Sequence, residues 1–294
     1  MAIGYPTDMI KRSVWLGLFL LVAWGCGAPS DGPPAFEPET GAFSILTYNV
    51  AGLPQGISGS NPETNIPMIS PLLNAYDVVL LQEDFWYPAE LAAQATHPHK
   101  STSKKATTAA IADGLNRYTV MPFEDLQRVQ WVACFGELTN ASDCLAEKGF
   151  SVSTLVLADG VIAHVYNHHA EAGGSPGDNE ARKAGIEQLA AFIIEHSIGQ
   201  AVILAGDTNL HGMDAEDEPV LQALMEATGL VDVCRHLQCP EESIDRVLFR
   251  SSDGLTLTPT LWARPTEFVD DEGKDLSDHR PVHVNIDWQT AATD

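Results

Sequence analysis

The chain has 294 residues, of which 45% are hydrophobic and 19% are charged, and this length and composition suit one large globular domain. Its formal net charge is −24 at pH 7, from 40 acidic and 16 basic side chains. A surface this acidic repels polyanions and is the opposite of the basic footprint of nucleic-acid-binding proteins, which disfavours DNA and RNA as main substrates.

The first 26 residues are typical of an export signal. A basic pair at 11–12 precedes an apolar run over 14–24, which is much shorter than the roughly 20 residues of a membrane-spanning helix. Gly25 followed by Cys26 resembles a bacterial lipoprotein cleavage site, in which the cysteine carries the lipid. We therefore predict a signal peptide over 1–26, lipidation of Cys26, and an outer-membrane or cell-surface lipoprotein. Ordinary signal cleavage with a secreted product, or a short tethering helix, is the alternative.

The next segment, residues 27–42, is rich in Pro, Gly and acidic side chains and is predicted to be a linker. From residue 43 onward, short β-rich runs alternate with helical patterns, and no further domain boundary is evident, so one domain is predicted over 43–289. Strands are predicted over 43–50, 77–82, 151–157, 161–167, 201–205, 246–250, 255–258 and 281–286.

Two helices are predicted between these strands. One begins near Asp178, where Ile186, Leu189 and Ile193 form an apolar stripe with helical spacing. The second spans 218–228 and ends at Gly229. Strands outnumber helices, so the predicted fold class is an α/β sandwich with sheets inside and helices outside.

Four cysteines lie in the predicted domain: Cys134, Cys144, Cys234 and Cys239. An even number in an exported chain predicts two disulfides, although four cysteines allow three connectivities. The short spacings favour Cys134 with Cys144 and Cys234 with Cys239. A zinc site is the alternative, but the spacings do not supply two matched short pairs of ligands.

Polar side chains gather at the ends of five predicted strands, where loops can bring them to one site. These residues are Asn49, Glu83, Asn167, His168, His169, Asp207, Asn209, Asp278 and His279. Their chemistry suits phosphoester hydrolysis, because Glu83 and the Asn49 amide suit a hard cation such as Mg²⁺. A histidine near its ordinary pKa of about 6.5, such as His279, can take a proton from water. His169 and Asn209 can donate hydrogen bonds to charge that develops on the phosphate oxygens.

The motifs LTYNV, LQE, NHH, GDTN, IDRV and SDHRPV occur in this order and resemble those of the endonuclease/exonuclease/phosphatase superfamily over about residues 43–287. That superfamily includes deoxyribonucleases, apurinic endonucleases, inositol polyphosphate phosphatases and sphingomyelinases. The resemblance implies a four-layer α/β sandwich in which two mixed β-sheets pack face to face. It also implies a Mg²⁺ cofactor, for which Mn²⁺ can substitute.

The resemblance assigns a role to each matched residue. Glu83 resembles the principal metal ligand, with Asn49 beside it, and Asp278 resembles a metal ligand or a residue that holds one. Among the catalytic residues, His169 matches the histidine that contacts the phosphate. Asp207 matches the residue that orients water or protonates the leaving group, and Asn209 matches its transition-state partner. His279 matches the general base, and Asp245 matches the carboxylate paired with that base. His168 stands where the family usually has Thr or Ser, and strand alternation favours His169 as the residue that faces phosphate.

Two features favour a phospholipid as the substrate, as in a sphingomyelinase or phospholipase C. The Gly-Leu-Pro sequence at 52–54, which follows Asn49, resembles sphingomyelinase-type members, and residues 27–294 carry a net charge of −25. The alternatives are an extracellular endonuclease, for which Lys100, Lys104 and Lys105 would supply a basic cluster, and an inositol-phosphate phosphatase. An inactive binding module is disfavoured because every matched catalytic position is retained. The aromatic residues 85–87 are either core or a wall of the substrate cleft.

Overall fold

The computed structural model describes Met1 and residues 38–136, 143–212 and 214–292. The predicted export signal, Cys26 and residues 27–37 of the predicted linker lie outside the described residues. Among the helices that are described, we find none with the length and apolar character needed to cross a membrane.

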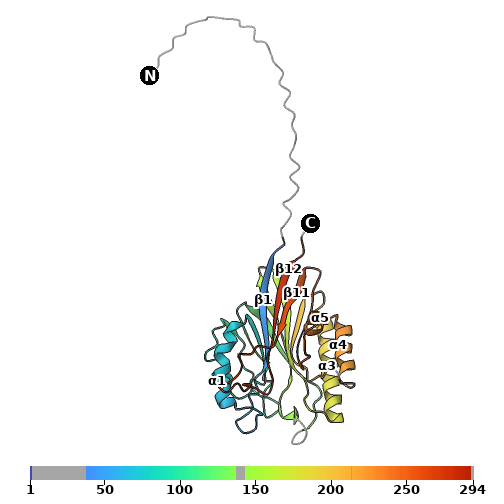
Figure 1. Ribbon diagram of the computed structural model, residues 1–294. Helices are drawn as coiled ribbons and strands as arrows, with labels where there is room; N and C mark the ends of the chain where they lie inside the picture. The colour runs from blue at the N-terminus through green and yellow to red at the C-terminus, as the bar shows by residue number, and fades with distance from the viewer. Residues whose placement is uncertain (2–37, 137–142, 213, 293–294) are drawn as a thin grey trace.

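Two six-stranded sheets pack face to face, and helices cover their outer surfaces (Figure 1). The first sheet has the order β11-β12-β1-β2-β4-β3 and the second β5-β6-β7-β8-β10-β9. Both are mixed, because β1 and β2 are parallel, as are β7 and β8, while their other strand pairs are antiparallel. The predicted four-layer α/β sandwich is therefore confirmed.

The strands of the first sheet are β1 (Thr40–Asn49), β2 (Val78–Gln82), β3 (His99–Lys100), β4 (Asn116–Thr119), β11 (Leu255–Ala263) and β12 (Val282–Thr290). Those of the second are β5 (Phe123–Gln130), β6 (Gly149–Ala158), β7 (Val161–His169), β8 (Val202–Asp207), β9 (Val231–Asp232) and β10 (Asp245–Arg250). The helices are α1 (Pro62–Leu72), α2 (Pro88–Ala92), α3 (Pro176–His196), α4 (Glu218–Thr228) and α5 (Val233–Leu237), with short 3-10 turns at Leu73–Ala75 and Asp143–Leu145.

Strand alternation divides the core into layers. On β1, Ile45 points into the core between the sheets, whereas Leu46 packs on the other face beside α1. On the second sheet, Ile186 and Leu189 of α3 pack in the outer layer, which confirms the predicted apolar stripe. Helix α4 ends where predicted, since Gly229 adopts the left-handed conformation at φ 71 that glycine accepts without steric cost.

Several elements differ from the sequence-based expectations, since β3, β4, β5, β9, α2 and α5 were not predicted, and two of the differences have a clear physical reason. Strand β1 begins at Thr40 rather than at residue 43, because 40–42 pair with 287–289 of β12. Helix α1 was not predicted. It contains Pro67 and Pro71, which weaken a helix, but it buries Ile66 and Ile69 against the first sheet. Packing against the sheet therefore outweighs the local cost of the two prolines.

Both predicted disulfides are present. Cys134 is bonded to Cys144 and Cys234 to Cys239. The first bridge joins the segment after β5 to the segment before β6, and the second joins α5 to the segment that leads into β10. The pairing favoured by the short spacings is thereby confirmed.

Candidate active site

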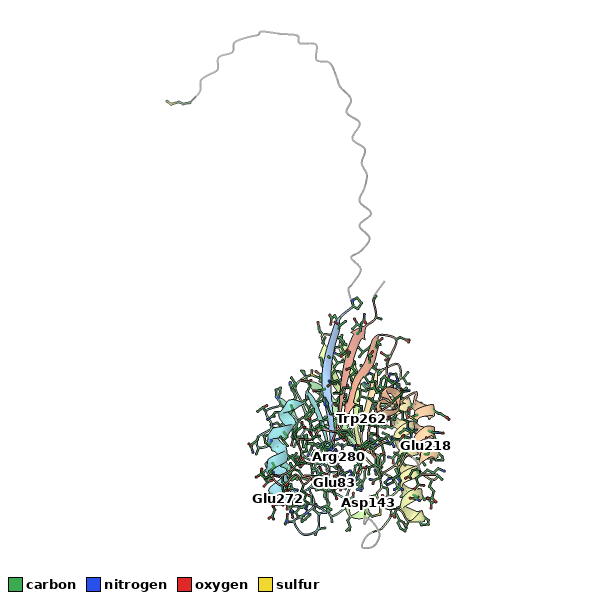
Figure 2. All side chains as sticks on the ribbon, viewed as in Figure 1. Glu83, Asp143, Glu218, Trp262, Glu272 and Arg280 are labelled. Carbon is green, nitrogen blue, oxygen red and sulfur yellow. A yellow bond between two sulfur atoms is a disulfide. The ribbon has the colours of Figure 1, made fainter. Side chains whose placement is uncertain are left out.

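Strand register brings the predicted site residues together at one end of the sandwich. His169, the last residue of β7, is paired with Asp207 of β8, and Asp207 is paired with Asp245 of β10. In the other sheet, Asn49 ends β1 opposite Gln82, directly before Glu83. Figure 2 shows Glu83 at the same end of the molecule as Asp143 and Arg280, between the two helical layers.

Asn49 joins the two sheets across the site. Its amide nitrogen donates to Glu83 Oε1 at 3.0 Å and to Asp207 Oδ2 at 3.1 Å. Its amide oxygen accepts from the backbone N–H of Ala51 at 3.1 Å. Asn49 is completely buried, so its contacts hold two carboxylates of different sheets on either side of one amide.

His279 and Asp245 form a hydrogen-bonded pair. His279 Nδ1 lies 3.0 Å from Asp245 Oδ2 and 3.2 Å from Oδ1, so the ring N–H donates to the carboxylate. The other ring nitrogen, Nε2, is directed toward the cluster and lies 3.7 Å from Asp207 Oδ2. Because the carboxylate fixes the tautomer, the nitrogen nearer Asp207 is the one free to exchange a proton.

The electrostatics of this pair favour the protonated imidazole. Burial alone would lower the pKa of His279, but the hydrogen bond to Asp245 and the charge of Asp207 raise it to about 10. Burial and the charge of Asp245 raise the pKa of Asp207 to about 6. The pKa of Glu83 is also raised, chiefly by burial. The three carboxylates therefore concentrate negative charge in a place that water reaches poorly.

His169 faces this cluster and His168 does not. His169 Nε2 lies 3.5 Å from Asp207 Oδ2 and 3.8 Å from Glu83 Oε1, and burial holds the pKa of this histidine well below its ordinary value. His168 instead donates from Nδ1 to the carbonyl oxygen of Ala205 at 3.0 Å. The two neighbouring side chains point to opposite faces of β7, as the alternation of a strand requires.

Two of the predicted site residues have a left-handed backbone conformation, which is strained at Glu83 and readily adopted by Asn209. Glu83 has φ 55 and Asn209 has φ 48, in the left-handed region that side chains other than Asn and Asp seldom adopt. Asn209 is held by its own N–H, which donates to Asp207 Oδ1 at 2.9 Å, and by its amide nitrogen, which donates to the carbonyl of Ala170 at 3.2 Å. The turns after β2 and β8 therefore hold the backbone of these two residues in a defined conformation next to the cluster.

Not every predicted residue is in direct contact with the cluster. Asp278 is exposed, and its carboxylate lies beside Gly59, where an added Cβ would come within 2.6 Å of Oδ2. Asn167 serves the core instead: its side chain accepts from Gln82 Nε2 at 2.7 Å and donates to the carbonyl of Leu81. This buried amide pair joins the two sheets directly behind the site.

The aromatic run at 85–87 serves several purposes. The Phe85 ring fills the space above Gly114, and Tyr87 packs against the layer between α1 and the first sheet. Trp86 is 57% exposed, three residues after Glu83. The core alternative therefore holds for Phe85 and Tyr87, whereas Trp86 is an exposed side chain.

One charged residue at the site was not predicted. Lys148 directly precedes β6 and is only 7% exposed, and its charge lowers the pKa of both Glu83 and His169. Nothing in the sequence distinguishes this lysine from the others, because it belongs to none of the six motifs. Only the pairing of β6 with β7 reveals its place.

The donor set at this end of the sandwich fits a hard cation. Glu83 and Asp207 share one amide donor, and both have raised pKa values that a nearby positive charge would relieve. Among the described residues, one group of potential ligands is close enough to hold an ion: single atoms of Asp207, Asp245 and His279 lie within 4.8 Å of one another. Since Mg²⁺ prefers oxygen and His279 is engaged with Asp245, Glu83 and Asp207 are the better donors.

Comparison with known proteins agrees with this geometry. No protein-family model matches the chain. It is 31% identical over 276 residues to the sphingomyelinases of Mycobacterium tuberculosis and Mycobacterium bovis, an alignment that covers 85% of the chain. The same alignment covers 53% of those proteins, so the chain spans about half the length of the curated relatives it matches.

Solved structures show the same fold. Sphingomyelinase C from Streptomyces griseocarneus superposes with a TM-score of 0.60 at 21% identity, covering 83% of this chain and 99% of that one. A mutant beta toxin from Staphylococcus aureus with bound magnesium ions gives a TM-score of 0.61 at 14% identity, covering 83% and 99%. The chain is therefore similar in sequence to sphingomyelinases over 85% of its length, and it has the fold of the sphingomyelinase and deoxyribonuclease-like endonuclease/exonuclease/phosphatase proteins.

Proposed function

We propose that the protein is a Mg²⁺-dependent phosphodiesterase that hydrolyses a choline-type phospholipid or sphingolipid. The observation that carries this proposal is the convergence of five side chains in one cluster, in which Asn49, Asp207 and Asp245 are buried and Glu83 and His279 are partly exposed. Phosphoester hydrolysis by a metal-assisted mechanism requires a general base and a bound cation. An imidazole oriented by a carboxylate supplies the first, and the neighbouring carboxylate oxygens can hold the second. The sequence relationship to sphingomyelinases supports a lipid rather than a nucleic acid as substrate.

His279 acts as the general base in this proposal. Its Nε2 takes a proton from the attacking water, while Asp245 holds the Nδ1–H and stabilises the imidazolium that forms. The pKa of about 10 means that the imidazole is protonated at neutral pH when no cation is bound. A bound Mg²⁺ would supply positive charge that neutralises the phosphate and the carboxylates, and this lowers the proton affinity of His279.

Glu83 is proposed as the principal metal ligand, and Asp278 remains a proposed ligand at the rim. Asn49 presents its nitrogen to Glu83 and Asp207 while its oxygen accepts from Ala51, so its main contribution is to hold the two carboxylates in place. To act as the predicted oxygen ligand beside Glu83, the amide would have to rotate, and its oxygen would lose the hydrogen bond from the N–H of Ala51.

The remaining residues act on the phosphate and the leaving group. His169 Nε2, close to both Asp207 and Glu83, is placed to donate to a phosphate oxygen. Asn209 uses its amide nitrogen for Ala170 and retains a second N–H for the same purpose. Asp207, with its pKa raised to about 6, is suited to protonate the leaving oxygen or to orient water.

The surface supports the choice of lipid over nucleic acid. Of the basic cluster proposed for an endonuclease, Lys104 is paired with Glu147 at 2.6 Å, and Lys100 donates to the carbonyl of Ala95 at 2.5 Å. Two of its three ammonium groups therefore already have protein partners. With a net charge of −24, the chain offers little that would attract a polyanion.

We also propose that the protein is exported and anchored through Cys26, which the two disulfides of the domain support because such bonds persist in oxidising compartments. Processing of the precursor that stops on treatment with globomycin, together with partition of the product into detergent, is the expected result. A freely soluble product that retains no lipid would contradict the anchor and leave the enzyme proposal untouched.

The enzymatic proposal is tested with one preparation of residues 27–294 and a matched His279→Ala variant. Phosphocholine release from mixed micelles of sphingomyelin or phosphatidylcholine should require Mg²⁺, stop in chelator and be absent from the variant. Release should also depend weakly on salt, whereas a nuclease that contacts several phosphates loses affinity steeply as salt rises. Plasmid nicking without phosphocholine release would overturn the lipid substrate.

A further inference from the structure

A pair of histidines lies on the outer face of the second sheet, away from the active site. His164 of β7 and His196, the last residue of α3, have ring centroids 5.3 Å apart and ring planes tilted by 37°. His164 lies on β7 before His169, by a distance of about 16 Å along a strand, and on the opposite face. The two histidines therefore take no part in the cluster around Asp207.

The imidazole of His164 is held in one orientation. Its Nδ1 lies 2.8 Å from the Oγ of Ser197, which is completely buried and lies 2.7 Å from the hydroxyl of Tyr166. Ser197 follows α3 directly, and its carbonyl oxygen accepts from Arg250 of β10, so helix and sheet fix its place together. With Nδ1–H donating to Ser197, Nε2 keeps its lone pair for a ligand. Metal-bound histidines commonly have this arrangement.

The surroundings keep His164 neutral. Burial lowers the pKa of this histidine, and the charges of His196 and Arg250 lower it further. A neutral imidazole is the form that binds metal ions, because a protonated nitrogen has no lone pair to give. Arg250 donates to the carbonyl oxygens of residues 197, 200 and 228, and its positive charge also opposes a bound cation. A metal site here therefore needs an acidic ligand.

Asp125 brings an acidic side chain to the same place. Together with both histidines, it lines a hollow of about 350 Å³ whose other lining residues are Leu126, Gln127 and Thr154. Asp125 belongs to an irregular part of β5 between Glu124 and Gln127, and its φ of 53 is a left-handed conformation that aspartate adopts more readily than most residues. Such bulges redirect side chains at the edge of a sheet. The backbone thus departs from the regular strand where the hollow forms.

The spacing of the two rings suits one tetrahedral ion. A zinc ion bound by Nε2 at about 2.0–2.1 Å lies about 3.2 Å from the centroid of that ring, so two imidazoles on one tetrahedral ion have centroids about 5 Å apart. The measured separation between His164 and His196 is 5.3 Å. Among the described residues, three ligand atoms within 4.8 Å of one another occur only at the active site. The carboxylate of Asp125, which is exposed, must therefore turn toward the rings when an ion binds.

We propose that His164, His196 and Asp125 form a second metal site, which binds a borderline divalent ion such as Zn²⁺, and that Ser197 orients His164 in it. Two imidazoles and one carboxylate, with water as the fourth ligand, are a known ligand set of zinc, whereas Mg²⁺ prefers oxygen ligands. A bound ion would join the edge strand β5 to β7 and to the end of α3. This site is separate from the proposed phosphodiesterase activity. The competing explanation is that the two rings only pack against one another.

The test is calorimetric titration of chelator-treated protein with Zn²⁺ in excess Mg²⁺. His196→Phe keeps an aromatic ring against Phe192, whose centroid lies 4.9 Å from that of His196, and removes both ring nitrogens. His236→Phe is the matched control, because His236 is an exposed histidine in edge contact with Phe249 at 5.7 Å, outside the hollow. The wild type and His236→Phe should share one zinc-binding step. Its affinity should fall by about 100-fold or more in His196→Phe, since losing even a group behind a ligand costs about 10- to 100-fold.

Two further variants test the other members of the site. Asp125→Asn removes the acidic ligand, and Ser197→Ala removes the hydrogen bond at His164 Nδ1, so each should weaken the same zinc-binding step by about 10- to 100-fold. In NMR spectra of the wild type, Zn²⁺ should shift the side-chain ¹⁵N resonances of His164 and His196. A zinc-binding step that is equal in the wild type and His196→Phe would place the ion elsewhere and overturn the proposal.

Folding and enzymatic function are checked separately. In chelator, His196→Phe should melt close to the wild type, because the residue it replaces is exposed. Added Zn²⁺ should raise the melting temperature of the wild type and of His236→Phe, but not that of His196→Phe, because an ion that binds only the folded state stabilises it. Equal rises in all three proteins would contradict the site. A protein that binds Zn²⁺ as expected but hydrolyses no phosphoester would refute the proposed function and leave this inference standing.

Discussion

Replacing Asp245 by Asn tests the hydrogen-bonded pair at the centre of the site. Asp245 is 3% exposed, and both of its oxygens lie within 3.2 Å of His279 Nδ1. Asparagine keeps the size of the side chain but removes its charge, and its amide can present an N–H where the carboxylate accepted one. The substitution should therefore disturb the charge and tautomer of His279 while leaving the strand pairing of β10 intact.

The expected magnitude follows from the pKa of His279. This pKa stands at about 10, against an ordinary value of 6.5, although burial by itself would lower it; the hydrogen bond and charge of Asp245 and the charge of Asp207 account for the rise. Loss of one adjacent carboxylate typically moves a pKa by about 1–3 units. Each unit is about 1.4 kcal/mol of preference for the imidazolium. With its general base misoriented, the enzyme should lose about 10²- to 10⁴-fold in kcat.

Two measurements check this reasoning. NMR titration of chelator-treated protein, with His279→Ala used to assign the resonance, should show the His279 pKa fall in Asp245→Asn. In the presence of Mg²⁺, the kcat of Asp245→Asn should be lower than that of the wild type at every pH. Asp287→Asn, an exposed position on β12, is the matched control and should change neither quantity. A His279 titration that is identical in wild type and Asp245→Asn would refute the pairing inferred from the geometry.

Three further predictions concern the metal, the pH dependence of stability and the disulfides. Glu83→Gln should raise the Mg²⁺ concentration for half-maximal activity by about 100-fold or more, since losing even a group behind a metal ligand costs about 10- to 100-fold; an unchanged requirement would exclude Glu83 as the ligand. Burial lowers the pKa of His168 to about 4, so the folded protein is most stable where this histidine is neutral, above about pH 6.5. As the pH falls toward 4, the free energy of unfolding should decrease by up to about 3 kcal/mol through this residue. Urea unfolding at pH 7 and pH 4.5 should show a smaller loss in His168→Asn than in the wild type, and equal losses would contradict the assignment. Denatured mature protein should show no reactive thiol, because the sulfur of Cys26 carries the lipid and the other four cysteines are paired, and two reactive thiols would contradict one bridge. Removing the Cys134–Cys144 bridge, with a sequence separation of 10, should lower the unfolding free energy by about 2–3 kcal/mol.

Much of this protein could be anticipated from local patterns. Strands such as β8, a run of buried apolar residues, have a signature that survives in any context, and Gly229 ends α4 because only glycine accepts the left-handed turn at no cost. The predicted site residues lie in short motifs directly beside those strands, and the structure brings most of them to one end of the sandwich. Such signals depend on neighbours within a few residues along the chain, so a sequence displays them in full.

Local patterns failed where distant contacts outweigh them. Pro67 and Pro71 argue against a helix, but α1 forms because it covers the apolar outer face of the first sheet. The start of β1 at Thr40 likewise depends on β12, the last strand of the chain. Neither contact can be inferred from the neighbouring residues in the sequence.

The arrangement within the site came from strand register and from the packing of the two sheets. Asp245 lies opposite Asp207 because β10 is antiparallel to β8, and the packing of the two sheets brings His279, which precedes β12, to within hydrogen-bonding distance of Asp245. The direction of the Asn49 amide and the approach of Lys148 to His169 have the same origin. Charge and hydrogen-bond geometry act over a few ångströms in space, whereas the sequence orders residues along a line. The candidate groups could therefore be named from the sequence, whereas their distances, tautomers and shifted pKa values exist only once the two sheets have packed.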